Sequence, residues 1–283
     1  MGKEIPIVSV TSVKDSLDQL DTIIDIYKEV GVLVLRGCKF SLEDQILITS
    51  KMGDVLGWNF YTDILKNDRV DGTYLGGHSD NPDANYSHGK DQYKLDWHIE
   101  QVFYIDPVLA GIWNMTHFSA EPDAGTTRFA DSIEIYESLS IEDQDFLDKS
   151  VVIWEKPMGQ TNGPFYTNVV APHPISGKPT LRVEMDHGCY RMPELHFWNG
   201  GIPSKEQVDR FNSIWGKIKG TLTGNVDIRY VQYWQEGDML IVDLFRMYHA
   251  VMGGFNYGER TFTGIGVRPK GFTHDLYISE DLV

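Results

Sequence analysis

The sequence has 283 residues, of which 41% are hydrophobic and 12% are aromatic, and its formal net charge at pH 7 is −16. This composition can support a substantial hydrophobic core and is not that of a disordered chain. The strong negative charge argues against nucleic acid or an anionic membrane surface as a partner, because both would repel the protein.

The cysteine content and the N-terminus narrow the class of protein further. Two cysteines, Cys38 and Cys189, cannot build a disulfide framework or a cysteine-based zinc cluster. Residues 1–6 contain no apolar signal stretch, and no hydrophobic run reaches the length of a membrane span. We therefore expect a soluble, cytoplasmic protein.

The first part of the chain predicts a helix, a strand and a second helix. Residues 14–30 place apolar side chains at helical spacing, and Gly31 is typical of a helix C-terminus. Residues 32–35 form an apolar run that predicts a buried strand. Ser41 followed by Asp44 resembles a capping box and predicts a helix as far as about Met52.

Residues 71–91 are rich in glycine, asparagine, proline and aspartate, and they predict a long irregular segment. A loop of this length inside a compact domain is typically either a functional lid or disordered. It leads directly into a strand predicted at residues 94–103, which favours a lid.

The rest of the chain predicts many short strands and a few inserted helices. Short helices are expected after caps at Ser132 and Ser140, and a longer one is expected from Pro203 to about Ile218. Strands are expected at residues 110–115, 151–154, 166–170, 181–184, 228–234, 239–244 and 260–267, and a turn at residues 121–125 leads into residues 126–131. No repeat or linker divides the chain. We therefore expect one α+β domain over residues 1–283, in which helices surround a jelly-roll (double-stranded β-helix) core.

The predicted strand at residues 94–103 carries His98 and Glu100, two residues apart. On a strand, such residues point to the same face. They would provide two of the three ligands of a 2-His-1-carboxylate metal site, if a second histidine came from elsewhere. The pair alone is weak evidence for a metal site, because a strand surface can carry a histidine and a glutamate that only pair with each other or contact water.

His249 and Arg260 are the candidates that complete this site. A predicted strand, turn and strand precede His249 and would hold it on rigid structure, where a third ligand is needed. Arg260 begins the last predicted strand, and its planar guanidinium can bind a carboxylate through two hydrogen bonds. The alternatives are a structural role for His249 and a surface ion pair for Arg260, for example with Glu259.

These segments together resemble the taurine dioxygenase/clavaminate synthase-like family of non-haem Fe(II), 2-oxoglutarate-dependent oxygenases. Residues 97–100 match the family's His-x-Asp/Glu motif, and residues 236–243 match its Gly-Asp turn. Residues 124–130 match its Gly-Gly-Asp-Thr-x-Trp-Ala segment, with Thr126 in place of the aspartate. Thr127 aligns with the threonine that helps to bind 2-oxoglutarate. His249 and Arg260 match the distal histidine and the arginine that binds the distal carboxylate of the co-substrate.

The resemblance implies that His98, Glu100 and His249 hold Fe(II), with open positions for 2-oxoglutarate and O2. It implies a dioxygenase that hydroxylates a C–H bond of a small polar substrate. Glutamate in place of the commoner aspartate is similar to the branch that acts on amino acids, so an amino acid or a derived metabolite is the expected substrate. Glu100 also argues against halogenation, because related halogenases have a small residue there.

Several alternatives stay open from the sequence. The same chemistry supports desaturation or cyclisation. A non-redox cupin-type isomerase or hydrolase would need the three metal ligands but neither Thr127 nor Arg260, and a silent scaffold would need none of them. Further residues are candidates for substrate contact by position only, namely Trp58, Tyr74, His78, His88, Asp186 and Arg191.

Overall fold

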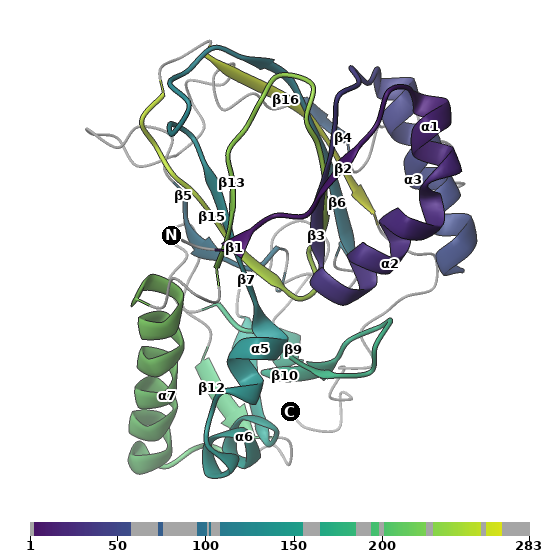
Figure 1. Cartoon of the computed structure of the whole chain (residues 1–283). Helices are drawn as coiled ribbons and strands as arrows, with labels where there is room; N and C mark the ends of the chain where they lie inside the picture. The colour runs from purple at the N-terminus through teal and green to yellow at the C-terminus, as the bar shows by residue number, and fades with distance from the viewer. Residues whose placement is uncertain are drawn as a thin grey trace.

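The computed structural model describes residues 3–57, 73–75, 95–100, 102, 108–154, 165–184, 194–197, 201–224, 229–255 and 259–267. Two β-sheets face each other in the upper part of the molecule (Figure 1), with N-terminal helices outside one sheet and a second group of helices and strands below. None of the helices in the described ranges combines the length and apolar character that crossing a bilayer requires.

Among the described residues, the larger sheet contains six strands, and the N-terminal helices cover its outer face (Figure 1). In sheet order the strands are β2 (Ile7–Ser9), β3 (Val32–Arg36), β14 (Met239–Asp243), β6 (Ala110–Phe118), β16 (Arg260–Val267) and β4 (Thr73–Leu75). The helices are α1 (Val13–Asp18), α2 (Leu20–Val30) and α3 (Leu42–Leu56). Apolar residues such as Ile23, Ile48 and Ile241 are buried at this helix–sheet interface.

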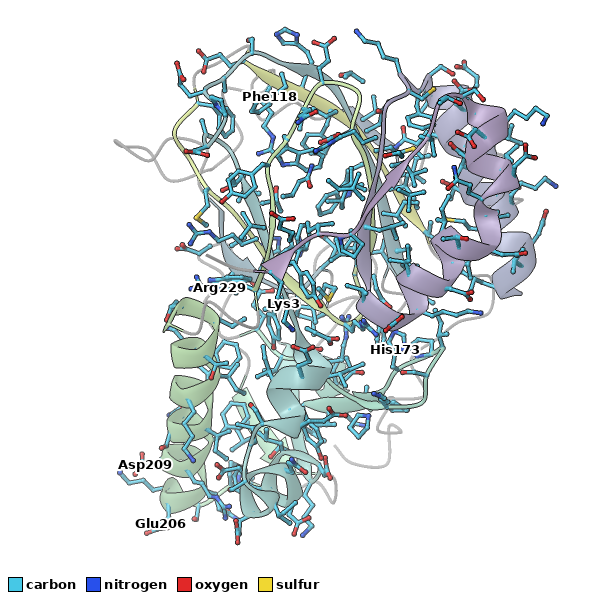
Figure 2. The ribbon with its side chains drawn as sticks, in the orientation of Figure 1. Lys3, Phe118, His173, Glu206, Asp209 and Arg229 are labelled. Carbon is cyan, nitrogen blue, oxygen red and sulfur yellow. The ribbon has the colours of Figure 1, made fainter. Side chains whose placement is uncertain are left out.

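The smaller sheet contains five strands in the part of the chain that the structure describes, and it carries most of the candidate site. In sheet order they are β1 (Lys3–Glu4), β13 (Arg229–Gln232), β7 (Thr127–Asp131), β15 (Met247–Val251) and β5 (Leu95–His98). The two sheets share one apolar cluster, in which Phe129 and Met247 of the smaller sheet join Trp113 and Leu240 of the larger one. Figure 2 shows side chains filling the space between the sheets.

The chain between β7 and β13 forms the lower part of the molecule (Figure 1). Its elements are α5 (Ser132–Glu137), α6 (Ile141–Leu147), β8 (Ser150–Trp154), β9 (Phe165–Asn168), β10 (Val170–Pro172), β11 (Pro179–Leu181), β12 (Glu194–Phe197) and α7 (Lys205–Gly224). An apolar cluster joins α7 to this part through Phe211 and Ile214, and it includes Tyr248 of β15. The lower part therefore packs directly behind the strand that carries His249.

Local capping chemistry explains several helix boundaries. Ser41 and Asp44 form the predicted capping box, in which each side chain accepts from the other's backbone N–H. Gly31 ends α2 in the left-handed conformation, with φ of 80°, as expected. The single helix predicted over residues 14–30 is instead two helices. The break lies at Gln19, whose side-chain amide donates to the Ser9 carbonyl and the Asp15 carboxylate.

Three other expectations about elements are wrong in detail. Asp131, not Ser132, caps α5, because its carboxylate accepts from the Ile133 N–H at 2.9 Å. The strand expected over residues 181–184 ends at Leu181, and β12 was not expected at all. Residues 73–75 form strand β4 inside the segment expected to be irregular, because they pair with β16. The remainder of residues 71–91 lies outside the described residues.

The turn before β14 depends on a buried carboxylate. Asp238 is 1% exposed and binds Arg36 through two contacts of 2.7 Å, while the Gln232 side chain and the Gln235 N–H also donate to it. Four donors on one carboxylate fix the turn that leads into the central strand of the larger sheet.

We expect Asp238→Ala to lower the free energy of unfolding by about 3–5 kcal/mol, because it leaves the Arg36 charge and the buried donors without their acceptor. Urea denaturation followed by circular dichroism measures the loss. Asp54→Ala is the control, since it breaks only the exposed Lys51–Asp54 pair and should cost less than about 1 kcal/mol. Equal losses in the two variants would contradict the role given to Asp238.

Candidate metal centre

Two neighbouring strands bring the candidate histidines together. β5 and β15 are antiparallel, and His98 pairs directly with His249 across them. The centroids of the two imidazole rings are 3.9 Å apart, and the ring planes are tilted by 54°. Both side chains are buried. Backbone pairing between distant parts of the sequence therefore places two nitrogen ligands side by side.

Glu100 completes the group from a turn just beyond β5. One ligand atom from each of His98, Glu100 and His249 lies within 4.8 Å of the others, and the shortest His249 Nε2–Glu100 Oε2 distance is 3.8 Å. The expectation that His98 and Glu100 share a strand face is wrong, because the strand ends at His98. Ile99 turns into the apolar core, and the chain then brings the Glu100 carboxylate back toward the histidines.

The surroundings of the histidines favour the form that binds a metal. The Nδ1 atom of His98 lies 2.8 Å from the Asp96 carbonyl, so Nδ1–H donates and Nε2 keeps its lone pair. Burial, with a smaller contribution from the neighbouring His98, holds the pKa of His249 well below its ordinary value. His249 is therefore neutral at pH 7, as a metal ligand must be.

The donor set fits an iron centre. Two neutral imidazoles and one carboxylate are the ligands of 2-His-1-carboxylate Fe(II) sites. The separation of 3.8 Å between His249 Nε2 and Glu100 Oε2 is longer than a hydrogen bond, so the two groups converge without binding each other. The Glu100 side chain is also 28% exposed, which leaves one side of the group accessible from outside the core.

Arg260 and Thr127 form a second polar group inside the core. Arg260 is 2% exposed, and its guanidinium donates to the Thr127 hydroxyl at 3.4 Å. The rings of Trp234, Phe255 and Phe262 surround the guanidinium, with centroids 5.4 to 5.7 Å from it. The alternative of a surface ion pair for Arg260 is wrong, because the side chain is buried.

Strand geometry relates this group to the histidines. Phe129 pairs with His249 across β7 and β15, and their rings stack with centroids 6.1 Å apart. Thr127 lies two residues from Phe129 on β7 and so points to the same face, on the order of 7 Å along the strand. A buried cation and a hydroxyl therefore lie on the same inner face as the candidate metal ligands.

Two facing β-sheets and a converging His-Glu-His group define a protein with a candidate metal site. Residues 1–265 match the family described as "Taurine catabolism dioxygenase TauD, TfdA family". The chain belongs to this family, as the motifs predicted, and it is an Fe(II)- and 2-oxoglutarate-dependent dioxygenase. Family membership supports a redox enzyme over the non-redox isomerase or hydrolase that the ligand set alone would allow.

Solved structures with the same fold are distant in sequence. A taurine dioxygenase from Burkholderia xenovorans is 13% identical, with a TM-score of 0.66 over 95% of this chain and 90% of that one. PvcB from Pseudomonas aeruginosa is 11% identical, with a TM-score of 0.64 over 89% and 82%. AAD-2, solved with Mn(II) and N-oxalylglycine, is 14% identical, with a TM-score of 0.61 over 96% and 98%. No protein of curated function matches the sequence.

Some residues around the site were not expected from the sequence. Trp234 donates its indole N–H to the Thr127 hydroxyl at 3.0 Å. Arg182 is fully buried beside the turn that carries Glu100. The available signal for Arg182 was its place between Leu181 and Val183 in a predicted strand. Among the candidate substrate contacts, Tyr74 lies on β4. The others lie outside the described residues, namely Trp58, His78, His88, Asp186 and Arg191.

Proposed function

We propose that His98, Glu100 and His249 bind the Fe(II) ion, and that Arg260 and Thr127 bind the distal carboxylate of 2-oxoglutarate. The observation that carries this proposal is the convergence of three candidate ligand atoms within 4.8 Å, two of them on buried histidines. When bound, the iron and the keto acid supply an oxidant made from O2.

The buried polar group is suited to a carboxylate. Thr127 Oγ1 accepts from Arg260 and from Trp234, so its own hydroxyl proton remains to be donated. Arg260 adds a guanidinium charge in surroundings from which three aromatic rings exclude water. A carboxylate placed there would gain charge-assisted hydrogen bonds that water does not weaken.

The reaction that we propose is hydroxylation of a C–H bond in a small polar substrate, an amino acid or an amino-acid-derived metabolite. The His-x-Glu motif supports this substrate class, and the carboxylate at residue 100 supports oxygenation over halogenation. Desaturation or cyclisation of the same substrate is the alternative outcome. The net charge of −16 supports a small molecule, and neither nucleic acid nor a membrane, as the partner.

We also propose that the two facing sheets form a jelly-roll core in a single domain over residues 1–283, with residues 71–91 as a lid. Pairing of β4 with β16 supports the lid. Since β16 begins at Arg260, this pairing attaches the segment to the strand that carries the proposed carboxylate-binding arginine.

Anaerobic addition of Fe(II) and 2-oxoglutarate should produce a visible absorption band that Fe(II) alone does not give. The keto acid must chelate the metal for this band to arise, so the band shows that the metal and the keto acid are bound together. His249→Ala is the matched control and should lose it. A folded wild-type protein without the band would contradict the cofactor assignment. With O2 admitted, a screen of amino acids for faster succinate formation then tests the substrate class.

A further inference from the structure

Arg182 is a fully buried charge beside the proposed iron ligands. It follows β11, and its guanidinium donates to the carbonyls of Phe245 at 2.7 Å and Leu244 at 3.4 Å. A longer contact of 3.5 Å reaches the carbonyl of Glu100. The guanidinium also lies 4.3 Å from the centroid of the Phe245 ring. One planar group thus joins the turn that carries Glu100 to the turn that leads into the His249 strand.

The two residues after Arg182 contact the same two segments. The Val183 carbonyl accepts from the Tyr248 hydroxyl at 2.6 Å, next to His249 in the chain. The Glu184 carboxylate accepts from the Ile99 N–H at 3.4 Å, between His98 and Glu100. Residues 182–184 therefore bind atoms of Glu100 itself and of the chain neighbours of all three proposed iron ligands.

The hairpin that precedes these residues is itself attached to the turn before His249. His173, labelled in Figure 2, follows β10, and its Nε2 lies 2.7 Å from the Asp243 carboxylate. Both side chains are buried. The other oxygen of Asp243 accepts from the N–H groups of Phe245 and Arg246. The hairpin thus fixes the turn whose carbonyls Arg182 binds.

We infer that residues 182–184 position the iron ligands, and that Arg182 is the central residue of this segment. This inference rests on the proposed function. The hydrogen bonds of Arg182 described above go to backbone carbonyls. Arg182 acts through the backbone of the two segments that carry the ligands, and so sets the distance between the Glu100 turn and the His249 strand.

Fold stability alone does not account for a charge at this place. Burial lowers the pKa of Arg182 to about 10, which still leaves the group charged at neutral pH. A buried charge is often no more stabilising than a well-packed apolar side chain of similar volume. The planar fork is what allows one side chain to bind carbonyls of two separate segments, and lysine lacks it. Ligand sites need such support, because small displacements of ligands weaken metal binding.

Arg182→Met tests this role. We expect it to weaken anaerobic Fe(II) binding by about 10- to 100-fold, the range for residues that orient metal ligands. The visible band of the Fe(II)–2-oxoglutarate complex should shift, and kcat should fall more than the KM for 2-oxoglutarate rises. Arg182→Lys should recover thermal stability more fully than iron affinity.

Arg246→Met is the matched control. Arg246 is a buried arginine in the turn whose carbonyls Arg182 binds. Its own side chain points to other partners: it binds the Lys28 and Glu29 carbonyls at the end of α2 and pairs with Asp131. The Arg246→Met substitution should lower the melting temperature and leave the iron affinity and the position of the visible band unchanged.

Two results would overturn the inference. One is a wild-type-like band and iron affinity in Arg182→Met, and the other is equal changes in Arg182→Met and Arg246→Met. If Arg182→Met does not fold, Tyr248→Phe decides, because it removes only the hydroxyl that binds Val183. An unchanged iron affinity in that variant would overturn the inference, and a weaker one would support it. Absence of the band in wild-type protein would instead contradict the proposed function.

Discussion

Replacement of Glu100 by glutamine is expected to reduce the rate of succinate formation by more than about 100-fold. This is a larger loss than that caused by removing a residue that only orients a metal ligand. The amide is neutral and a weak ligand, so the two imidazoles would have to hold the metal without the anionic oxygen. Because the other two members of the triad, His98 and His249, are buried imidazoles, neither can supply the lost anionic oxygen. Anaerobic Fe(II) titration should show the corresponding loss of affinity.

Two further variants make the Glu100 result specific. Glu100→Asp keeps the carboxylate on a shorter side chain and should retain part of the iron affinity, since aspartate is the commoner residue of this motif. His117→Ala removes a half-exposed histidine near Glu236 and should change neither iron affinity nor turnover. Full iron affinity in Glu100→Gln would show that Glu100 is not a ligand.

Arg260→Ala is expected to raise the KM for 2-oxoglutarate by about 30-fold or more. Removing one partner of a buried, hydrogen-bonded charge pair costs about 2–5 kcal/mol, and each 1.4 kcal/mol is tenfold in affinity. The guanidinium is enclosed by aromatic rings, so water cannot replace its hydrogen bonds to a carboxylate. Steady-state kinetics with varied 2-oxoglutarate measure the change.

Conservative variants separate binding from folding in this case. Arg260→Lys keeps a charge without the planar fork and should raise KM less than alanine does. Thr127→Val removes one hydroxyl with little change in volume and should give a smaller rise in KM than Arg260→Ala. An unchanged KM in Arg260→Ala would place the carboxylate-binding group elsewhere.

Local rules in the sequence were sufficient for many elements and for the identity of the ligands. The capping box at Ser41, the glycine that ends α2 and the cap at Ser140 follow from the nearest few residues, and each is observed. His98, Glu100 and His249 were selected by spacing and resemblance, and the fold brings the three together.

What the sequence could not provide depends on contacts between distant segments. β4 exists because it adds to the edge of β16, and β12 exists because it pairs with β8. Neither segment has a local pattern that separates a strand from a loop. Glu100 reaches the histidines through a turn rather than along a strand, and nothing in residues 94–103 indicates where the strand stops. The role inferred for Arg182 likewise depends on two turns that only the folded chain places on either side of it.

The direct pairing of His98 with His249 has a consequence for folding. In the described part of the chain, β5 is the last strand of its sheet, and the register of its pairing shifts between His249 and Val251. A slip of one residue at such an edge would turn His98 to the opposite face and separate the two imidazoles. Metal can bind only the correct register, so its binding free energy adds to the stability of that register alone. The ion would then act as a selector of strand alignment as well as a cofactor.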